Sequence, residues 1–154
     1  MLSAIEIEKI SHELQQVPVK KAACIEALKI VQEQRRWVSD ESVADIATFL
    51  DMSTAEVDSV ATFYNLIFRR PVGRHVILLC DSISCYVMGY TKILERLTDI
   101  LQIRYGQTTP DERFTLLPNA CLGTCDHAPA LMIDDDLYRD IKEEEVETIL
   151  NKYL

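Results

Sequence analysis

Four of the five cysteines form two close pairs, and paired thiols are the side chains of this sequence best suited to chemistry. Four residues separate Cys80 from Cys85, and three separate Cys121 from Cys125. Thiolates bind zinc and iron, and paired thiols can also form disulfides. The pairs therefore predict a metal or redox centre. The fifth cysteine, Cys24, lies on an alanine-rich helical segment, where we expect a small buried hydrophobic residue.

The spacing of the pairs leaves three kinds of site open. A structural zinc ion accepts four thiolates, usually from pairs spaced by two to four residues on tight turns. A [2Fe–2S] cluster has two irons that take two thiolates each, so its ligands spread further apart. The lack of a Cys-x-x-Cys motif argues against a thioredoxin-type dithiol. The spacing favours the cluster over zinc, with disulfides as the third alternative.

Each pair follows a segment that is predicted to be a strand. Residues 75–80 form a short apolar run with β-branched residues, and residues 114–117 form another. The helical pattern of residues 87–103 lies between them, as expected for parallel strands joined by a helix. The carboxyl ends of parallel neighbours lie side by side. We therefore expect the pairs to sit in two loops that converge on one point.

The rest of this half completes an α/β layout. We expect a strand at 130–133, a hairpin turn at 134–136, a short strand at 137–138 and a C-terminal helix around Val146, Ile149 and Leu150. The order β-α-β-β-β-α predicts a thioredoxin-like domain over residues 73–154. Because thioredoxin-like folds often carry a cis proline after the site loop, we also predict a cis Ala128–Pro129 bond.

Residues 1–72 differ in composition and apolar periodicity from the rest of the chain and predict a helical bundle. They contain no glycine, and Pro18 and Pro71 are their only prolines. Apolar periodicity predicts helices at 2–16 and 22–35, a third beginning at Ser39 or Asp40, and a fourth beginning at a capping box. The capping box consists of Ser53 and Glu56. Three aromatic residues follow at helical spacing, and we expect them in the core unless a partner covers them: Phe63, Tyr64 and Phe68.

Charge and hydropathy exclude several classes of protein. The chain has 25 acidic and 16 basic residues and a net charge of −9, which disfavours nucleic acid as a partner. No apolar run approaches the roughly 18 residues of a membrane span, so no direct membrane insertion is expected. The first residues resemble neither a signal peptide nor a transit peptide, which favours a cytoplasmic location. His12, His75, His127 and the acidic run 134–136 are expected to be structural or surface residues, not ligands.

Several segments together resemble one family. They are Val60-Ala61-Thr62-Phe63-Tyr64, Pro71-Val72-Gly73, Cys80 to Cys85 with Gly89, and Cys121-Leu122-Gly123-Thr124-Cys125 with Ala128-Pro129. This set is similar to the thioredoxin-like [2Fe–2S] subunits of respiratory complex I, the NADH:quinone oxidoreductase, especially their enterobacterial form. The resemblance covers nearly the whole chain. Two positions depart from the common pattern, namely Arg36, where many members carry glycine, and Ala120, where many carry glutamate.

The resemblance implies a function and a set of ligands. Cys80, Cys85, Cys121 and Cys125 would be the ligands of one [2Fe–2S] cluster, two for each iron. The protein would be an electron-transfer subunit with no catalytic residue of its own. Its partners would be the flavin-containing NADH-binding subunit and other subunits of the peripheral arm, at the cytoplasmic face of the inner membrane. The alternatives are a similar subunit of an NAD-linked hydrogenase or formate dehydrogenase, or a zinc-stabilised interaction module.

Overall fold

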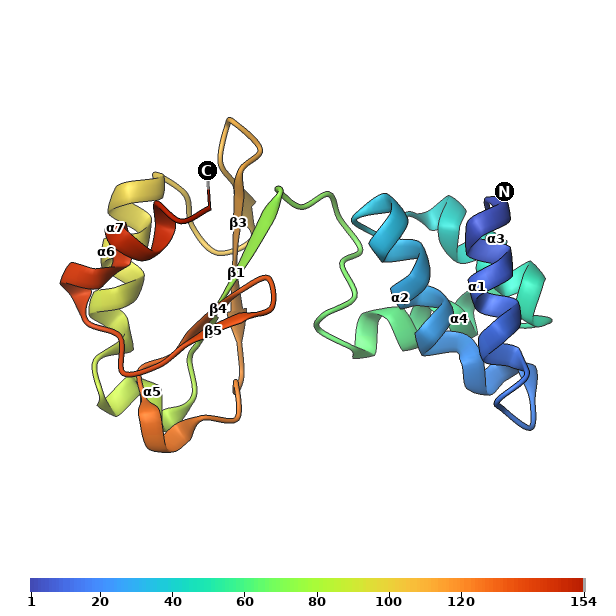
Figure 1. Cartoon of the computed structure of the whole chain (residues 1–154), viewed down its shortest axis with the longest axis horizontal. Helices are drawn as coiled ribbons and strands as arrows, with labels where there is room; N and C mark the ends of the chain where they lie inside the picture. Colours follow the sequence, from blue (N-terminus) through green and yellow to red (C-terminus); the bar gives the residue numbers. More distant parts are fainter. Residues whose placement is uncertain (154) are drawn as a thin grey trace. The chain divides into compact units, whose positions relative to one another are not determined.

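A computed structural model describes residues 1–153, which form two compact units (Figure 1). The first unit spans Met1–Pro71 and the second begins at Val72. The boundary predicted from the sequence, after residue 72, lies one residue later than the boundary in the structure. Within residues 1–153, no helix is both long enough and apolar enough to cross a membrane.

The first unit is a bundle of four α-helices. These are α1 (Ala4–Leu14), α2 (Cys24–Arg35), α3 (Asp40–Leu50) and α4 (Thr54–Phe63), with a 3-10 turn at Lys20–Ala23 before α2. Their apolar faces enclose one core that includes Ile10, Leu28, Ile46 and Val57. Cys24 belongs to this core as a free thiol, which confirms its expected role as a small buried residue.

The ends of these helices follow from local side-chain chemistry. Ser53 and Glu56 form the predicted capping box at α4, and Ser39 caps α3 by accepting from the amide of Ser42. Ser3 and Glu6 form a second capping box, which was not predicted. These caps satisfy amides that the first turn of a helix leaves without partners.

The structure excludes one of the two interpretations of the aromatic residues, the core position, for Phe63 and Tyr64. Phe63 and Tyr64 were expected in the core unless a partner covers them, but their side chains are 80% and 46% exposed. α4 ends at Phe63, and Tyr64 adopts an extended conformation beyond it. The helical spacing therefore does not continue far enough to turn these rings inward, while Ile67 is buried in their place.

The second unit is built on a five-stranded sheet of order β2-β3-β1-β4-β5. Its strands are β1 (His75–Cys80), β2 (Gln107–Thr108), β3 (Phe114–Asn119), β4 (Leu131–Ile133) and β5 (Asp136–Tyr138). β1 and β3 are parallel, as predicted, and the other neighbours are antiparallel. The hairpin between β4 and β5 confirms the turn expected at the acidic run.

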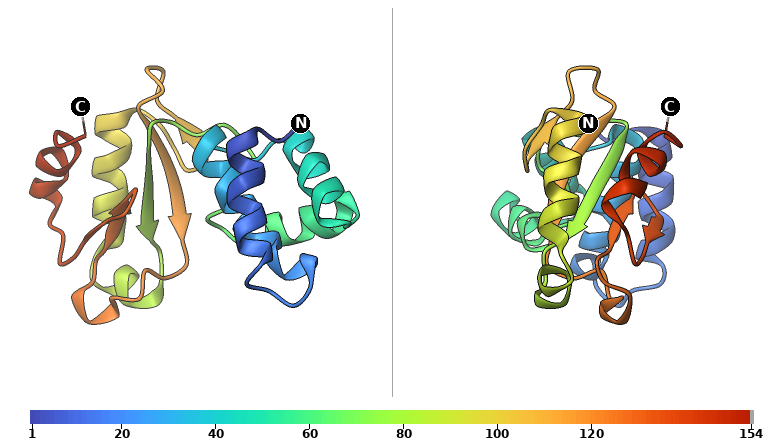
Figure 2. Two further views of the ribbon diagram at one scale, coloured as in Figure 1. Left: turned by 45° about the vertical axis from the view of Figure 1, so that its right-hand side comes forward. Right: turned by 90° about the vertical axis from the view of Figure 1, so that its left-hand side faces the viewer.

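The helices of this unit are α5 (Ile83–Val87), α6 (Tyr90–Leu101) and α7 (Val146–Leu150), with 3-10 turns at Cys125–His127 and Glu143–Glu145. Both views show α6 and α7 on the same face of the sheet (Figures 1 and 2). Alternate strand residues such as Ile77, Leu79 and Leu116 form the core with them. The single helix predicted at 87–103 is wrong at its start, because Gly89 takes a left-handed conformation (φ 97°) and separates α5 from α6.

Candidate metal centre

Cys80 is placed by the parallel pair of strands at the centre of the sheet. It is the last residue of β1, so it lies in the strand and not in the following loop as expected. Its register partner in β3 is Asn119, and the amide of Asp81 donates to the carbonyl of Asn119 at 3.1 Å. The second thiol pair begins two residues after Asn119. The sheet register therefore brings the two pairs to the same end of the sheet.

Cys85 lies on the short helix α5 and joins Cys80. Both side chains are buried, and they pack with Ala128 in a small apolar cluster. Burial, followed by the adjacent thiol of Cys80, raises the pKa of Cys85 to about 11. Its thiol also accepts from the backbone of Ala130. Without a metal the thiol of Cys85 is therefore protonated at neutral pH, and binding a metal there releases its proton.

Cys121 and Cys125 form the second pair, in the loop after β3. Their sulfurs are 3.7 Å apart, and both side chains are exposed. In a tetrahedral site with metal–sulfur bonds of about 2.3 Å, two sulfurs of one metal lie about 3.8 Å apart. The separation already matches two ligands of the same metal. The neighbouring thiol of Cys121 is also the main cause of a raised pKa at Cys125.

Backbone and side-chain donors hold this outer pair in position. Gly123 takes a left-handed conformation (φ 74°), and its amide donates to the sulfur of Cys121 at 3.3 Å. The buried Asn119 donates its side-chain amide to the carbonyl of Cys121 at 3.0 Å. The hydroxyl of Ser84, from α5, reaches Cys125. Donors of this kind lower the negative charge on thiolate ligands and tune a metal centre.

The two thiol pairs lie near each other. The thiols of Cys80 and Cys125 are close enough to interact electrostatically, and Cys125 also interacts with Cys85. No trio of His, Cys, Asp or Glu side chains within residues 1–153 is gathered as it would be around a single metal ion. A centre with two irons needs two thiolates at each iron, and this arrangement fits that donor set.

The neighbouring loop is fixed by contacts that do not use metal ligands. The Ala128–Pro129 bond is cis, as predicted. His127 lies beside the outer pair, but its Nδ1 is 2.7 Å from a carboxylate oxygen of Asp140, and its carbonyl accepts from the amide of Asp140. This contact with Asp140 supports the interpretation of His127 as a surface residue that is not a ligand.

An apolar surface next to the site was not predicted. Ile83, Tyr86, Val87 and Met88, which we call the α5 patch, are each at least 60% exposed. They belong to the same turn as Cys85, and Asp81 and Asp126 are exposed acidic residues next to Cys80 and Cys125. The available signal was the run of apolar residues after Cys85, but a helix of five residues is too short for periodicity to reveal which side faces solvent.

Comparison with known proteins identifies close relatives over the whole chain. The chain is 49% identical over 154 residues to the E subunit of the NADH-quinone oxidoreductase of Pseudomonas aeruginosa, covering 100% of this chain and 93% of that protein. It is 50% identical over 152 residues to the protein of that name in Escherichia coli K12, covering 99% and 92%. These relatives are subunits of an oxidoreductase, so this protein acts together with partner subunits.

A solved structure shares the fold at lower identity. A chain of an NAD⁺-reducing [NiFe]-hydrogenase in the air-oxidized state superimposes with a TM-score of 0.68 at 24% identity, over 87% of this chain and 22% of that chain. At this identity the likeness shows the fold alone, so it gives no support to the hydrogenase alternative.

Residues 10–154 match the family described as thioredoxin-like [2Fe–2S] ferredoxin. This match and the relatives confirm the fold, the [2Fe–2S] cofactor and the role of electron-transfer subunit of an NADH:quinone oxidoreductase that the sequence led us to expect. The two converging thiol pairs thus sit in a chain that belongs to the thioredoxin-like [2Fe–2S] ferredoxin family.

Proposed function

We propose that Cys80 and Cys85 bind one iron of the cluster, and that Cys121 and Cys125 bind the other. The observation that carries this proposal is the meeting of two thiol pairs at one end of the sheet, with the outer pair at the sulfur separation that one metal requires. When bound, the cluster supplies one-electron chemistry. The chain supplies the thiolates, the amide of Gly123 and the hydroxyl of Ser84 as donors, and a buried wall behind the inner pair.

The partner that exchanges electrons with this site is the flavin-containing NADH-binding subunit. The α5 patch supports this proposal because it is apolar, exposed and continuous with the helix that carries Cys85. Electron exchange requires the partner to approach the site closely, and burial of apolar surface favours such docking. The assembly belongs to the peripheral arm of the complex, at the cytoplasmic face of the inner membrane.

A second docking surface lies on the helical unit. Phe63, Tyr64 and Leu66, which we call the aromatic tip, are exposed, and the first two rings pack edge to face at 5.1 Å. Gln32 fixes the segment behind them, because its side-chain amide donates to the carbonyl of Leu66 at 2.8 Å and accepts from the amide of Phe68 at 2.6 Å. Preorganised aromatic residues of this kind are typical anchors of protein interfaces.

The ligand assignment is tested with the purified full chain. We expect the wild-type protein to contain iron and sulfide, to absorb visible light and to give an EPR signal when reduced. Cys121→Ala removes a ligand without offering another donor and should abolish the signal. Cys24→Ala, which changes the buried cysteine of the bundle, should leave the signal intact. Stoichiometric zinc in a colourless wild-type protein, or a full signal in Cys121→Ala, would contradict the assignment.

The partner is tested by co-purification of this chain with the flavin subunit. Phe63→Glu and Tyr86→Glu place a charge in the aromatic tip and in the α5 patch, and each should weaken the association at least tenfold. Val19→Glu, at an exposed apolar residue outside both surfaces, is the matched control and should associate normally. Normal association of both interface variants would rule out these docking surfaces, while the cluster assignment would stand.

A further inference from the structure

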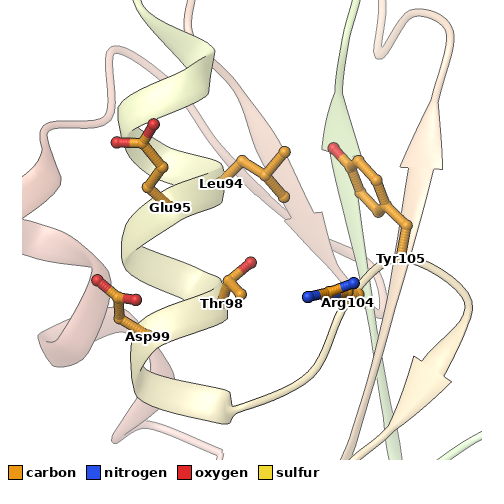
Figure 3. A pocket seen from close by; sticks show the side chains of 6 residues that line it. All are labelled: Leu94, Glu95, Thr98, Asp99, Arg104 and Tyr105. Atoms are coloured by element: carbon orange, nitrogen blue, oxygen red, sulfur yellow. The ribbon is translucent and has the colours of Figure 1, made fainter.

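Tyr105 lines an open pocket between α6 and the loop that follows it. It follows α6 in the loop that leads to β2, and its partly buried side chain packs against the buried core of the sheet. The pocket has a volume of about 460 Å³. Figure 3 shows Leu94 of α6 pointing toward Tyr105, and the side chains that line the pocket are Leu94, Glu95, Thr98, Asp99, Arg104 and Tyr105.

The hydroxyl of Tyr105 is buried without a well-formed hydrogen bond. Its oxygen is almost inaccessible to solvent, and no polar group of residues 1–153 forms a well-aligned hydrogen bond with it, although the phenol of Tyr90 is close enough to interact with it. Buried hydroxyl groups almost always have a partner, and an unsatisfied one destabilises the folded state. Phenylalanine would fill the same space without this penalty. The hydroxyl oxygen of Tyr105 therefore indicates a role other than packing.

The surroundings of this hydroxyl lead toward the inner thiol pair. Burial, followed by the neighbouring Tyr90, Asp81 and Cys80, raises the pKa of Tyr105 well above its usual range, so the phenol stays neutral. The ring of Tyr90 in turn packs against the cluster of Cys80, Cys85 and Ala128. The two phenols thus form a continuous path from the pocket wall to the thiols.

We propose that Tyr105 is a positioning residue that acts through Tyr90 to raise the reduction potential of the centre held by the inner thiol pair. This inference rests on the proposed function, because it requires a redox centre at the four cysteines. Reduction adds negative charge beside Cys80, where the carboxylate of Asp81 opposes it. A neutral O–H dipole favours the added charge, and its effect is larger in a low-dielectric interior than in water.

In the oxidised protein, the poorly satisfied hydroxyl of Tyr105 lowers the stability of the folded state. Reduction makes the thiolates more negative, so they become stronger hydrogen-bond acceptors for this hydroxyl. An O–H without a well-formed hydrogen bond can reorient at little expense, because only its poorly aligned contact with the phenol of Tyr90 has to change. This distinguishes Tyr105 from Tyr153, whose hydroxyl is 2.8 Å from that of Tyr138 and donates to Asp136 at 2.7 Å.

The test compares two substitutions that each remove one oxygen from the same unit. Tyr105→Phe should lower the ratio of reduced to oxidised protein threefold to tenfold at the wild-type midpoint, where tenfold corresponds to 59 mV for one electron. Tyr153→Phe should leave the ratio unchanged, because Tyr153 contacts His75 at the opposite end of β1 from Cys80. The ratio is read by EPR during a redox titration of the purified full chain.

Thermal stability provides a control in which the two substitutions should have the opposite pattern of effects. Tyr153→Phe breaks two hydrogen bonds and should lower the thermal midpoint, whereas Tyr105→Phe breaks no well-formed hydrogen bond and should not. A merely structural role for Tyr105 would show the reverse pattern, with lower stability and an unchanged ratio, and would overturn the inference. If Tyr105→Phe loses iron, Tyr90→Phe takes its place in the comparison with the same expected ratio. A wild-type protein without any cluster signal would refute the proposed function itself, which separates the two failures.

Discussion

The ion pair between Glu6 and Arg35 joins a buried carboxylate to a partly buried guanidinium in the helical unit, and its removal should destabilise that unit selectively. Both carboxylate oxygens of Glu6 accept from the guanidinium, each at 2.7 Å, and one of them also accepts from the amide of Ser3 at 2.6 Å. Glu6 is 1% exposed, whereas the side chain of Arg35 is 30% exposed. Glu6→Gln keeps the shape and removes the charge.

The expected loss follows from this difference in exposure. Breaking a fully buried pair costs about 3–5 kcal/mol, because the remaining charge is left without a partner. Water still reaches part of Arg35, so we expect about 2–3 kcal/mol for Glu6→Gln. With a urea m value of about 1 kcal/mol/M for a small domain, the unfolding midpoint should fall by about 2–3 M.

The assay is the fluorescence of Trp37 during urea unfolding. Trp37 is the only tryptophan of the chain and lies in the helical unit, so its signal reports on that unit. Glu33→Gln is the matched control, because Glu33 pairs with Lys9 at 3.2 Å on the surface and is 61% exposed. Its effect should be at most about 0.5 kcal/mol.

The pH dependence of the unfolding midpoint can refute this explanation. The hydrogen bonds from Arg35 lower the pKa of Glu6 below its ordinary value of 4.5 despite burial. The stabilisation by the pair is therefore fully present above about pH 4.5 and is lost as the pH falls through the lowered pKa. The midpoints of wild type and Glu6→Gln should differ at pH 7 and converge in acid. Equal midpoints at pH 7, or a gap that persists in acid, would refute the reasoning.

Three further substitutions test single features of the two units. Arg36→Gly should stabilise the bundle by up to about 1 kcal/mol in urea unfolding, because Arg36 ends α2 in a left-handed conformation (φ 72°) that glycine adopts more easily. Gly123→Ala should lower the thermal midpoint by the equivalent of about 1 kcal/mol, and Gly123→Asn by less, because the position is left-handed with open space around it. Ala120→Glu should lower the reduction potential by the equivalent of about 0.5–1 kcal/mol, whereas Ala120→Gln should not, because only a carboxylate beside Cys121 opposes added charge.

The sequence predicted those parts of the fold that short-range chemistry determines. Ser39 and Ser53 mark helix starts because their side chains cap the next turn, and both starts are confirmed. The strand at 75–80 is confirmed because a run of β-branched and apolar residues is buried on both sides. The left-handed conformation of Arg36 is one that glycine adopts more easily, which fits the glycine that the family resemblance leads us to expect at this position.

The missed features depend on contacts between distant residues. β2 has two residues and exists only because it pairs with β3, so no periodic pattern could reveal it. The exposure of Phe63 and Tyr64 depends on where α4 ends, and helical spacing cannot separate a ring that faces the core from one that faces a partner. The place of Tyr105 beside the site results from a chain reversal after α6, which leaves no mark in its neighbours in sequence.

The acidic residues around the site predict that its potential depends on the partner. Asp81 and Asp126 are exposed and directly follow Cys80 and Cys125, and their charges oppose the addition of an electron. A partner that docks on the α5 patch and offers lysine or arginine at its rim would pair these carboxylates and remove that opposition. We therefore expect a higher midpoint potential in the assembled complex than in the isolated chain, and a rise in the isolated chain when salt screens the carboxylates. The double substitution Asp81→Asn and Asp126→Asn should raise the potential of the isolated chain and shrink both effects. A potential that responds to neither salt nor assembly would show that hydrogen bonds and burial alone set it.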